Sequence, residues 1–204
     1  MTKIKICGLT SPKEADYVNE AHADFAGFVL FYPKSKRNLT ISQAKEIFTA
    51  LDKEINKVAV VVSPTLEEII QIENAGFDYL QIHGTLTNEL LSAIHLPILK
   101  AFNVKDMEQY DTFHQEDKIK GYVFDAAVPG SGKTFNWNLV KKIPRDEKLF
   151  ILAGGLNEDN VAEAINAIKP DAVDVSSGVE FADGTPGKDP QRIRDFVQAI
   201  KTTI

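Results

Sequence analysis

The sequence predicts an α/β protein in which parallel strands close into a (β/α)8 barrel, with residues 1–204 forming one domain. Eight short strands alternate with eight helical patterns, and no linker-like stretch interrupts the alternation. The strands are mostly continuous apolar runs, as expected where both faces of a sheet are buried. An open, doubly wound sheet is the main competitor, because a count of strands does not prove that the barrel closes.

We expect strands near residues 3–8, 25–31, 57–62, 78–82, 97–102, 121–125, 149–153 and 171–175. The helices between them have clear start signals. Ser11 and Pro12 supply an N-cap and a first-turn proline, Glu14 completes a capping box, and Asp189-Pro190 opens the last helix in the same way. Apolar residues recur at helical spacing over 161–168 and 193–200, and the weakest helical pattern lies around 105–113. This order of elements is typical of a TIM barrel.

Composition and charge exclude several classes of protein. The chain has 204 residues, of which 44% are hydrophobic and 25% charged, and its net charge of -6 argues against a nucleic-acid partner. Cys7 is the only cysteine, which excludes an intrachain disulfide and fits a reducing compartment. No apolar run is long enough for a membrane span, and residues 1–10 have no signal-peptide core, so we expect a cytoplasmic protein.

A glycine-rich loop ending in Gly-Lys-Thr at 132–134 resembles a nucleotide phosphate loop. The first glycine of that pattern would stand at 127, where the chain has Ala127. Pro129 removes a backbone amide donor from the loop, and Asp125 would place a carboxylate near the bound anion. We therefore do not expect a nucleotide site here.

In (β/α)8 barrels the active site lies at the carboxyl ends of the strands. Cys7 ends the first strand, and the side-chain period of two places Lys5 and Cys7 on the inner face if Ile4 and Ile6 pack against helices. A nearby ammonium would favour the thiolate and lower the thiol pKa. The alternative is that Cys7 is simply a small buried apolar residue.

Asp125 is the acid that ends the sixth strand. Such a carboxylate commonly caps the next helix or pairs with a lysine, but the long glycine loop that follows favours a role as general acid or base. Gly154-Gly155 and Ser176-Ser177-Gly178 follow the seventh and eighth strands, where barrels of this kind often bind phosphate through backbone amides. A tight turn is the simpler interpretation of either loop alone.

Two further strand ends carry candidates for binding. Arg37, in the basic loop 32–37, is suited to an anionic substrate because its guanidinium can hold a carboxylate through two bonds, whereas Lys34 and Lys36 are expected to be solvated. His83 ends the fourth strand, and a lone histidine is more often structural. With one cysteine and 4 histidines, no metal-ligand cluster emerges.

Several motifs, in this order and spacing, resemble the phosphoribosylanthranilate isomerase family of tryptophan biosynthesis. They are KICGLT at 5–10, LQIHG at 80–84, FDAAVPGSGKTFNW at 124–137, LAGGLNEDNV at 152–161, DVSSGVE at 174–180 and PGKD at 186–189. The resemblance spans nearly the whole chain and implies a (β/α)8 barrel. It also implies a cofactor-free Amadori rearrangement of a phosphorylated aminosugar, N-(5-phosphoribosyl)anthranilate.

The resemblance also implies roles for individual residues. Cys7 matches the general base that takes the proton from ribose C2, and Asp125 matches the general acid that opens the ring. The positions that match substrate-lining residues are Arg37, His83 and Asp174, and those that match the phosphate loops are Gly154, Gly155, Ser177 and Gly178. Both monomers and homodimers suit a barrel of this size.

The chain departs from the family pattern at three places. Asn136 stands where the family usually has aspartate, Lys36 stands where it has proline before Arg37, and PGKD at 186–189 is one residue shorter. Three alternative functions stay open. They are a histidine-pathway aminoaldose isomerase, which would use carboxylates at the ends of strands one and five, a metal-dependent pentose-phosphate epimerase, and a barrel that binds a phosphorylated ligand without turnover.

Overall fold

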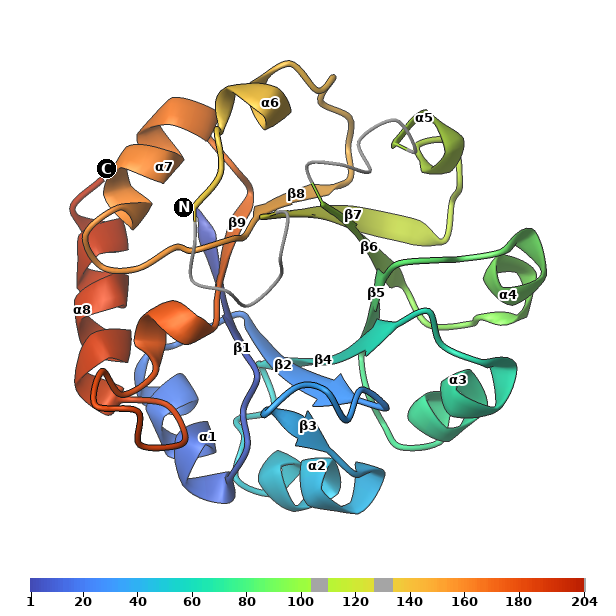
Figure 1. The fold of residues 1–204 in the computed structure, drawn as a ribbon, viewed down its shortest axis with the longest axis horizontal. Helices are drawn as coiled ribbons and strands as arrows, with labels where there is room; N and C mark the ends of the chain where they lie inside the picture. Colours follow the sequence, from blue (N-terminus) through green and yellow to red (C-terminus); the bar gives the residue numbers. More distant parts are fainter. Residues whose placement is uncertain (104–109, 127–133, 204) are drawn as a thin grey trace.

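The computed structural model describes residues 1–103, 110–126 and 134–203. Its strands hydrogen-bond in the order β1-β9-β8-β7-β6-β5-β4-β2-β3, and a further pairing of β1 with β2 closes the ring. Every pairing between these strands is parallel. The prediction of a closed (β/α)8 barrel is therefore confirmed, and the alternative of an open sheet is wrong (Figure 1).

Eight strands make the barrel: β1 Lys3–Cys7, β2 Phe25–Leu30, β4 Asn56–Val62, β5 Tyr79–His83, β6 Ile98–Asn103, β7 Ile119–Asp125, β8 Leu149–Leu152 and β9 Ala172–Val175. The helices are α1 Pro12–Glu20, α2 Ile41–Phe48, α3 Leu66–Glu73, α4 Asn88–Ala93, α5 Tyr110–Phe113, α6 Asn138–Lys141, α7 Val161–Ile168 and α8 Pro190–Lys201. The sequence did not predict β3, Asn38–Leu39, which pairs with β2, nor the short helix η2, Ser177–Val179. No helix in the described ranges is long and apolar enough to cross a bilayer.

The residues predicted to start the first and last helices make hydrogen bonds to the backbone of the first helical turn. The Glu14 carboxylate accepts from the backbone N–H of Ser11 at 3.3 Å, and Asp189 accepts from the N–H of Gln191 at 2.8 Å. These carboxylates satisfy amide donors that have no partner within the first turn of a helix. α5 is short, as expected from its weak pattern, although residues 104–109 of that prediction lie outside the described residues.

The core has two layers, as the alternation of strand side chains requires. Outward-facing strand residues such as Ile4 and Ile6 lie in one cluster with helix residues such as Val161 and Phe196. Inward-facing residues fill the barrel as a separate cluster that includes Cys7, Val60, Val123 and Ile151. The two predicted helix faces, over 161–168 and 193–200, are buried in the outer layer.

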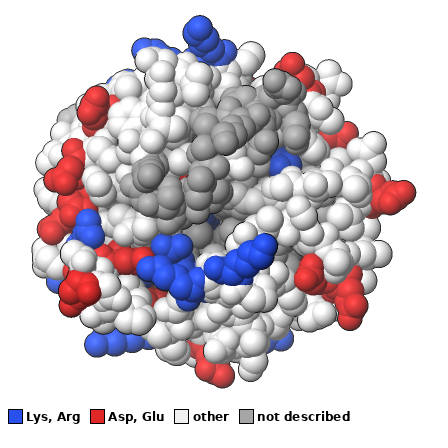
Figure 2. Space-filling view, viewed as in Figure 1, with Lys and Arg blue, Asp and Glu red and all other residues white. Residues whose placement is uncertain are grey.

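Figure 1 looks into the end of the barrel at which the strands finish. Successive strands follow each other counterclockwise in this view, and right-handed crossovers then direct the carboxyl ends of the strands toward the viewer. Figure 2 shows the same face, with Lys and Arg side chains near its middle and most Asp and Glu side chains around its margin. The face on which barrels of this kind carry their active sites is thus positive at its centre.

Candidate active site

β1 points two polar side chains into the barrel. Ile4 and Ile6 lie in the outer layer of the core, whereas Cys7 belongs to the interior cluster. Lys5 shares that inner face and is fully buried. The prediction that Lys5 and Cys7 point inward is confirmed, because the side-chain period of two holds along the whole strand.

A buried ion pair links β1 to β9. Lys5 and Asp174 are register partners, and the Lys5 Nζ lies 2.7 Å from Asp174 Oδ2. Burial opposes the ammonium form of Lys5, but Asp174 and the Cys7 thiol outweigh that effect and raise its pKa. Asp174 Oδ1 is buried and has no hydrogen-bond partner within the described part of the chain. The pair therefore keeps a cation beside Cys7 and leaves one carboxylate oxygen available as an acceptor.

Cys7 is a buried thiol next to that ammonium. Burial raises the pKa of the Cys7 thiol above its ordinary value, although Lys5 acts against the increase. Asp174 adds to the increase, and Lys188 opposes it. The expectation of a lowered thiol pKa is therefore wrong for this structure, because the loss of hydration outweighs the neighbouring cations.

Asp125 ends β7 with its side chain inside the barrel mouth, on the same face as Val123, and is 8% exposed. Its Oδ1 accepts the backbone N–H of Ala126 at 2.7 Å. Burial raises the pKa of Asp125 to about 6, and Asp174 adds to the increase, while the Ala126 N–H and Lys5 oppose it. A carboxyl group with this pKa is protonated at neutral pH far more often than an ordinary aspartate, which suits it to donate a proton.

Gly154 keeps the approach to Asp125 open. It has a φ of +86°, and a Cβ atom at this position would lie 2.6 Å from the backbone nitrogen of Ala126 and 3.1 Å from Asp125 Oδ1. Both the backbone conformation and the space therefore require glycine here.

Cys7 and Asp125 lie on nearly opposite sides of one mouth. The strands that they end, β1 and β7, are separated by β9 and β8, which places them three positions apart in a ring of eight. The electrostatic influence of Lys5 and Asp174 reaches both side chains. The structure thus places a thiol and a protonatable carboxyl, far apart in the sequence, at the same end of the barrel.

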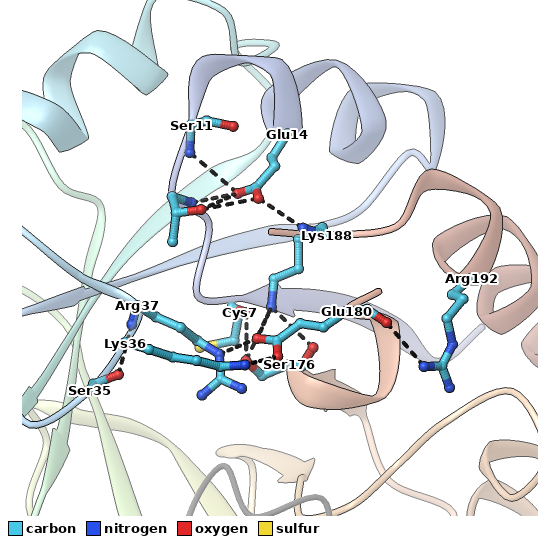
Figure 3. A network of polar contacts seen from close by, with 11 residues as sticks. Cys7, Ser11, Glu14, Ser35, Lys36, Arg37, Ser176, Glu180, Lys188 and Arg192 are labelled. Atoms are coloured by element: carbon cyan, nitrogen blue, oxygen red, sulfur yellow. Dashed lines mark hydrogen bonds and ion pairs between the residues drawn. The ribbon is translucent and has the colours of Figure 1, made fainter. Parts of the chain in front are cut away.

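Arg37 lies beside Cys7 in a network of charged side chains (Figure 3). Its Nε donates to Glu180 Oε1 at 2.5 Å, while Lys36 Nζ lies 2.7 Å from Glu180 Oε2. Burial disfavours the charged form of Glu180, but the bonds from Arg37 and Lys36 prevail and hold its pKa at about 2. Lys36 was expected to be solvated, and its side chain is 71% exposed although it takes part in this pair.

Lys188 forms the buried part of the same network. Its Nζ donates to the carbonyl oxygen of Ser176 at 3.0 Å and lies 3.2 Å from the Ser176 hydroxyl. That hydroxyl donates to the carbonyl oxygen of Cys7 at 2.8 Å. Burial lowers the pKa of Lys188 to about 8, against the influence of Glu180. Lys188 therefore ties the segment that follows β9 to the end of β1.

His83 ends β5, half-buried at the mouth, and its Nε2 lies 2.9 Å from the Nε2 of the buried Gln81. Burial lowers the pKa of His83 to about 3, and Lys100 and Lys5 add to that effect. The imidazole is therefore neutral over the physiological range, so it can exchange hydrogen bonds with a ligand but carries no charge.

The two predicted phosphate loops lie against each other. A Cβ atom on Gly178 would overlap the carbonyl oxygen of Leu156, so η2 packs directly on the loop after β8. Gly154 and Gly155 have φ values of +86° and +68°. Among the described residues, the N–H groups of these two glycines have no backbone acceptor. These main-chain donors are therefore available to an anion, and binding of phosphate here stays a prediction.

Sequence reasoning missed part of this site. Glu180 and Lys188 were not among the predicted site residues, although an acid two residues beyond a glycine loop is a signal that could have identified Glu180. The glycine loop itself, including Ala127 and Pro129, lies outside the described residues. Within residues 1–103, 110–126 and 134–203, no three His, Cys, Asp or Glu side chains are grouped as a metal site would require.

The chain is similar to known proteins along its whole length. A family model described as N-(5'phosphoribosyl)anthranilate (PRA) isomerase matches residues 4–199. An N-(5'-phosphoribosyl)anthranilate isomerase from Streptococcus gordonii is 40% identical over 205 residues, covering 100% of both chains. One from Thermoanaerobacter sp. is 39% identical over 208 residues and covers 98% of each.

Solved structures agree. A phosphoribosyl anthranilate isomerase from Thermotoga maritima superimposes with a TM-score of 0.86 at 35% identity, covering 99% of this chain and 100% of that one. A second isomerase structure is a complex with reduced 1-(o-carboxyphenylamino)-1-deoxyribulose 5-phosphate. Its TM-score is 0.82 at 34% identity, with 99% and 100% of the two chains covered. The resemblance inferred from the motifs is confirmed, and the chain belongs to the N-(5'-phosphoribosyl)anthranilate isomerase family.

Proposed function

We propose that this protein is a cytoplasmic enzyme of tryptophan biosynthesis that isomerises N-(5'-phosphoribosyl)anthranilate to 1-(2-carboxyphenylamino)-1-deoxyribulose 5-phosphate. The observation that carries the proposal is the pairing of Asp125, with its pKa of about 6, and Cys7 across one barrel mouth, in a chain of this family. An Amadori rearrangement needs one acid and one base and leaves the atom count unchanged. We propose that it proceeds here without a cofactor.

Asp125 is the general acid. It donates its proton to the ring oxygen of the ribose while the bond between that oxygen and C1 breaks. The lone pair of the anthranilate nitrogen then forms a C=N bond to C1, which opens the sugar and gives a cationic iminium. The pKa of about 6 supports this role, because an ordinary aspartate would hold its proton too rarely near neutral pH.

Cys7 is the general base. Its thiolate removes the proton from C2, and the electron pair of that bond forms C1=C2 while the C=N electrons return to nitrogen. The product is an enolamine that tautomerises to the ketose. Burial raises the pKa of the Cys7 thiol and so disfavours the thiolate in the free protein. The positive charge that the iminium brings to C1 acts together with Lys5 in the opposite direction and favours the thiolate.

The remaining candidates bind the substrate. Arg37 pairs with the carboxylate of the anthranilate ring, and Asp174, through the free Oδ1, accepts from a sugar hydroxyl. Neutral His83 hydrogen-bonds the ligand at the opposite side of the mouth. The phosphate binds to the main chain at Gly154, Gly155, Ser177 and Gly178. The reduced ligand in the related complex is named as a carboxyphenylamino sugar 5-phosphate, so it carries a group for each of these contacts.

Turnover is the direct test. The purified protein should convert N-(5'-phosphoribosyl)anthranilate to product without added metal. Cys7→Ala and Asp125→Ala should each lower kcat by about 10²–10⁴-fold. Circular dichroism and urea unfolding would show that both variants are folded. If the wild-type protein binds the substrate without turning it over, the non-catalytic alternative is correct.

The other enzymatic alternatives are less well supported. A histidine-pathway aminoaldose isomerase would need carboxylates at the ends of the first and fifth barrel strands, and these end in Cys7 and Asn103. A substrate of that pathway, supplied in a parallel assay, is expected to give no product. We also propose that the protein acts as a monomer or homodimer; the relative from Thermotoga maritima is described as dimeric.

A further inference from the structure

The carboxylate of Glu180, far from Arg37 in the sequence, holds the loop that carries Arg37. Glu180 directly follows η2, and its Oε1 accepts from Arg37 Nε at 2.5 Å across a separation of 143 residues. The contact has little solvent around it, since both side chains are 12% exposed. A charge-assisted hydrogen bond in this environment is strong and fixes direction as well as distance.

Glu180 is itself held in place. Lys188 Nζ lies 3.6 Å from its Oε1, and the Glu180 carbonyl oxygen accepts from Arg192 at 3.0 Å. Lys188 is in turn fixed at its backbone N–H, which donates to Glu14 at 2.8 Å. Figure 3 shows this sequence of contacts from Glu14 through Lys188 to Glu180 and Arg37. The carboxylate that meets Arg37 is therefore a fixed anchor.

The bond uses only one edge of the guanidinium. Figure 3 shows the terminal nitrogens of Arg37 directed away from Glu180, and among the described residues no hydrogen bond from these nitrogens is found. The side chain lies over Gly8, where a Cβ atom would overlap Arg37 Cδ. Gly8 directly follows Cys7. The guanidinium is thus held close to Cys7, the proposed base, and the edge formed by its two terminal nitrogens makes no hydrogen bond to the described residues.

We infer that Glu180 is a positioning residue that holds Arg37 so that the free edge of the guanidinium meets the carboxylate of the substrate. This inference rests on the proposed function, in which Arg37 binds that carboxylate. Because Glu180 does not touch the reacting atoms, its loss should weaken substrate binding and leave the chemical step nearly intact. Its carboxylate remains ionised throughout the working pH range, so the effect should not depend on pH there.

Two substitutions separate geometry from charge. Glu180→Asp keeps the charge and withdraws the carboxylate by one methylene, whereas Glu180→Gln keeps the shape and removes the charge. Both should raise KM about tenfold and change kcat less than about twofold, because Arg37 must then be ordered when the substrate binds. The control is Glu20→Gln, which removes a carboxylate from an exposed pair with Arg194, and its KM should be unchanged.

A double-mutant cycle makes the test specific. If Glu180 acts through Arg37, the variant Arg37→Ala/Glu180→Gln should have the same KM as Arg37→Ala alone. Additive effects on KM would overturn the inference. So would a fall in KM for Glu180→Gln, which would mean that the carboxylate merely repels the anionic substrate.

A second measurement does not need turnover. In the wild-type protein the Nε–H signal of Arg37 should be resolved and protected from exchange by nitrogen-edited NMR, and Glu180→Asp should remove that protection. An inactive wild-type protein would overturn the proposed function and with it the role in binding. An active wild-type protein whose KM and Arg37 signal are unchanged in Glu180→Asp would overturn only the inference about Glu180.

Discussion

Asp125→Asn should make the protein more stable at neutral pH while it removes the proposed acid. The wild-type carboxyl is almost buried, and burial raises its pKa from 3.8 to about 6. The folded protein therefore stabilises the ionised form of Asp125 less well than water does in the unfolded chain. Asparagine has nearly the same shape, can still accept the N–H of Ala126, and has no charge to bury.

The size of the effect follows from the pKa. A carboxyl whose pKa rises from 3.8 to about 6 on folding destabilises the folded state by about 3 kcal/mol at pH values above both. Below about pH 4 the group is protonated in the folded and unfolded states, so there is no penalty. Between these limits the unfolded chain releases a proton that the folded protein keeps, and the stability contributed by Asp125 falls as the pH rises.

Urea unfolding of the wild type and Asp125→Asn at two pH values measures this. We expect the variant to be more stable by about 1.5 kcal/mol at pH 5 and about 3 kcal/mol at pH 7.5. Asp183→Asn is the control, because Asp183 is exposed and hydrogen bonds from Thr185 lower its pKa. That variant should gain no stability at either pH. A variant at position 125 that is no more stable than the wild type, or equally so at both pH values, would refute the assignment of a buried, strained carboxyl.

Three further predictions concern the interior of the mouth. Lys5→Met should lower the free energy of unfolding by about 3–5 kcal/mol in a urea titration, because it leaves Asp174 buried without its ion-pair partner; an unchanged midpoint would contradict the buried pair. Gly154→Ala should be destabilised more than Gly184→Ala in thermal unfolding. Both positions have positive φ, +86° and +85°, but only Gly154 has neighbours within 4 Å of an added Cβ. Alkylation of Cys7 by iodoacetamide should have its midpoint above the ordinary thiol pKa of about 8.5, since burial raises it; a midpoint below that value would show that the cations prevail.

The fold could be predicted because its signals are local. Each strand is a short apolar run, and caps such as Ser11 with Glu14 mark where helices begin whatever the remainder of the chain does. The rule that active sites lie at strand ends then selects Cys7 and Asp125, since both are the last residues of their strands. These steps need only the periodicity of the chain and the topology that it implies.

The electrostatics of the site could not be predicted in this way. A sequence shows that Lys5 is near Cys7, but the sign of the change in thiol pKa depends on how much water the folded structure excludes. The bond between Arg37 and Glu180 joins loops at the two ends of the chain, and no local pattern encodes it. The ion pair between the exposed Lys36 and Glu180 could not be predicted for the same reason.

The pair of Lys5 and Asp174 acts in opposite directions on Cys7 and Asp125, the proposed base and the proposed acid. Its two charges have opposite signs, so the net effect on a neighbour depends on which charge acts more strongly there. Lys5 is the stronger influence on Cys7 and favours the thiolate, whereas Asp174 is the stronger influence on Asp125 and favours the protonated carboxyl. The ion pair thus acts on each group in the direction that the proposed reaction needs, although at Cys7 burial outweighs it. Neither a lone lysine nor a lone aspartate could do this, because a single charge would shift the pKa of both groups the same way.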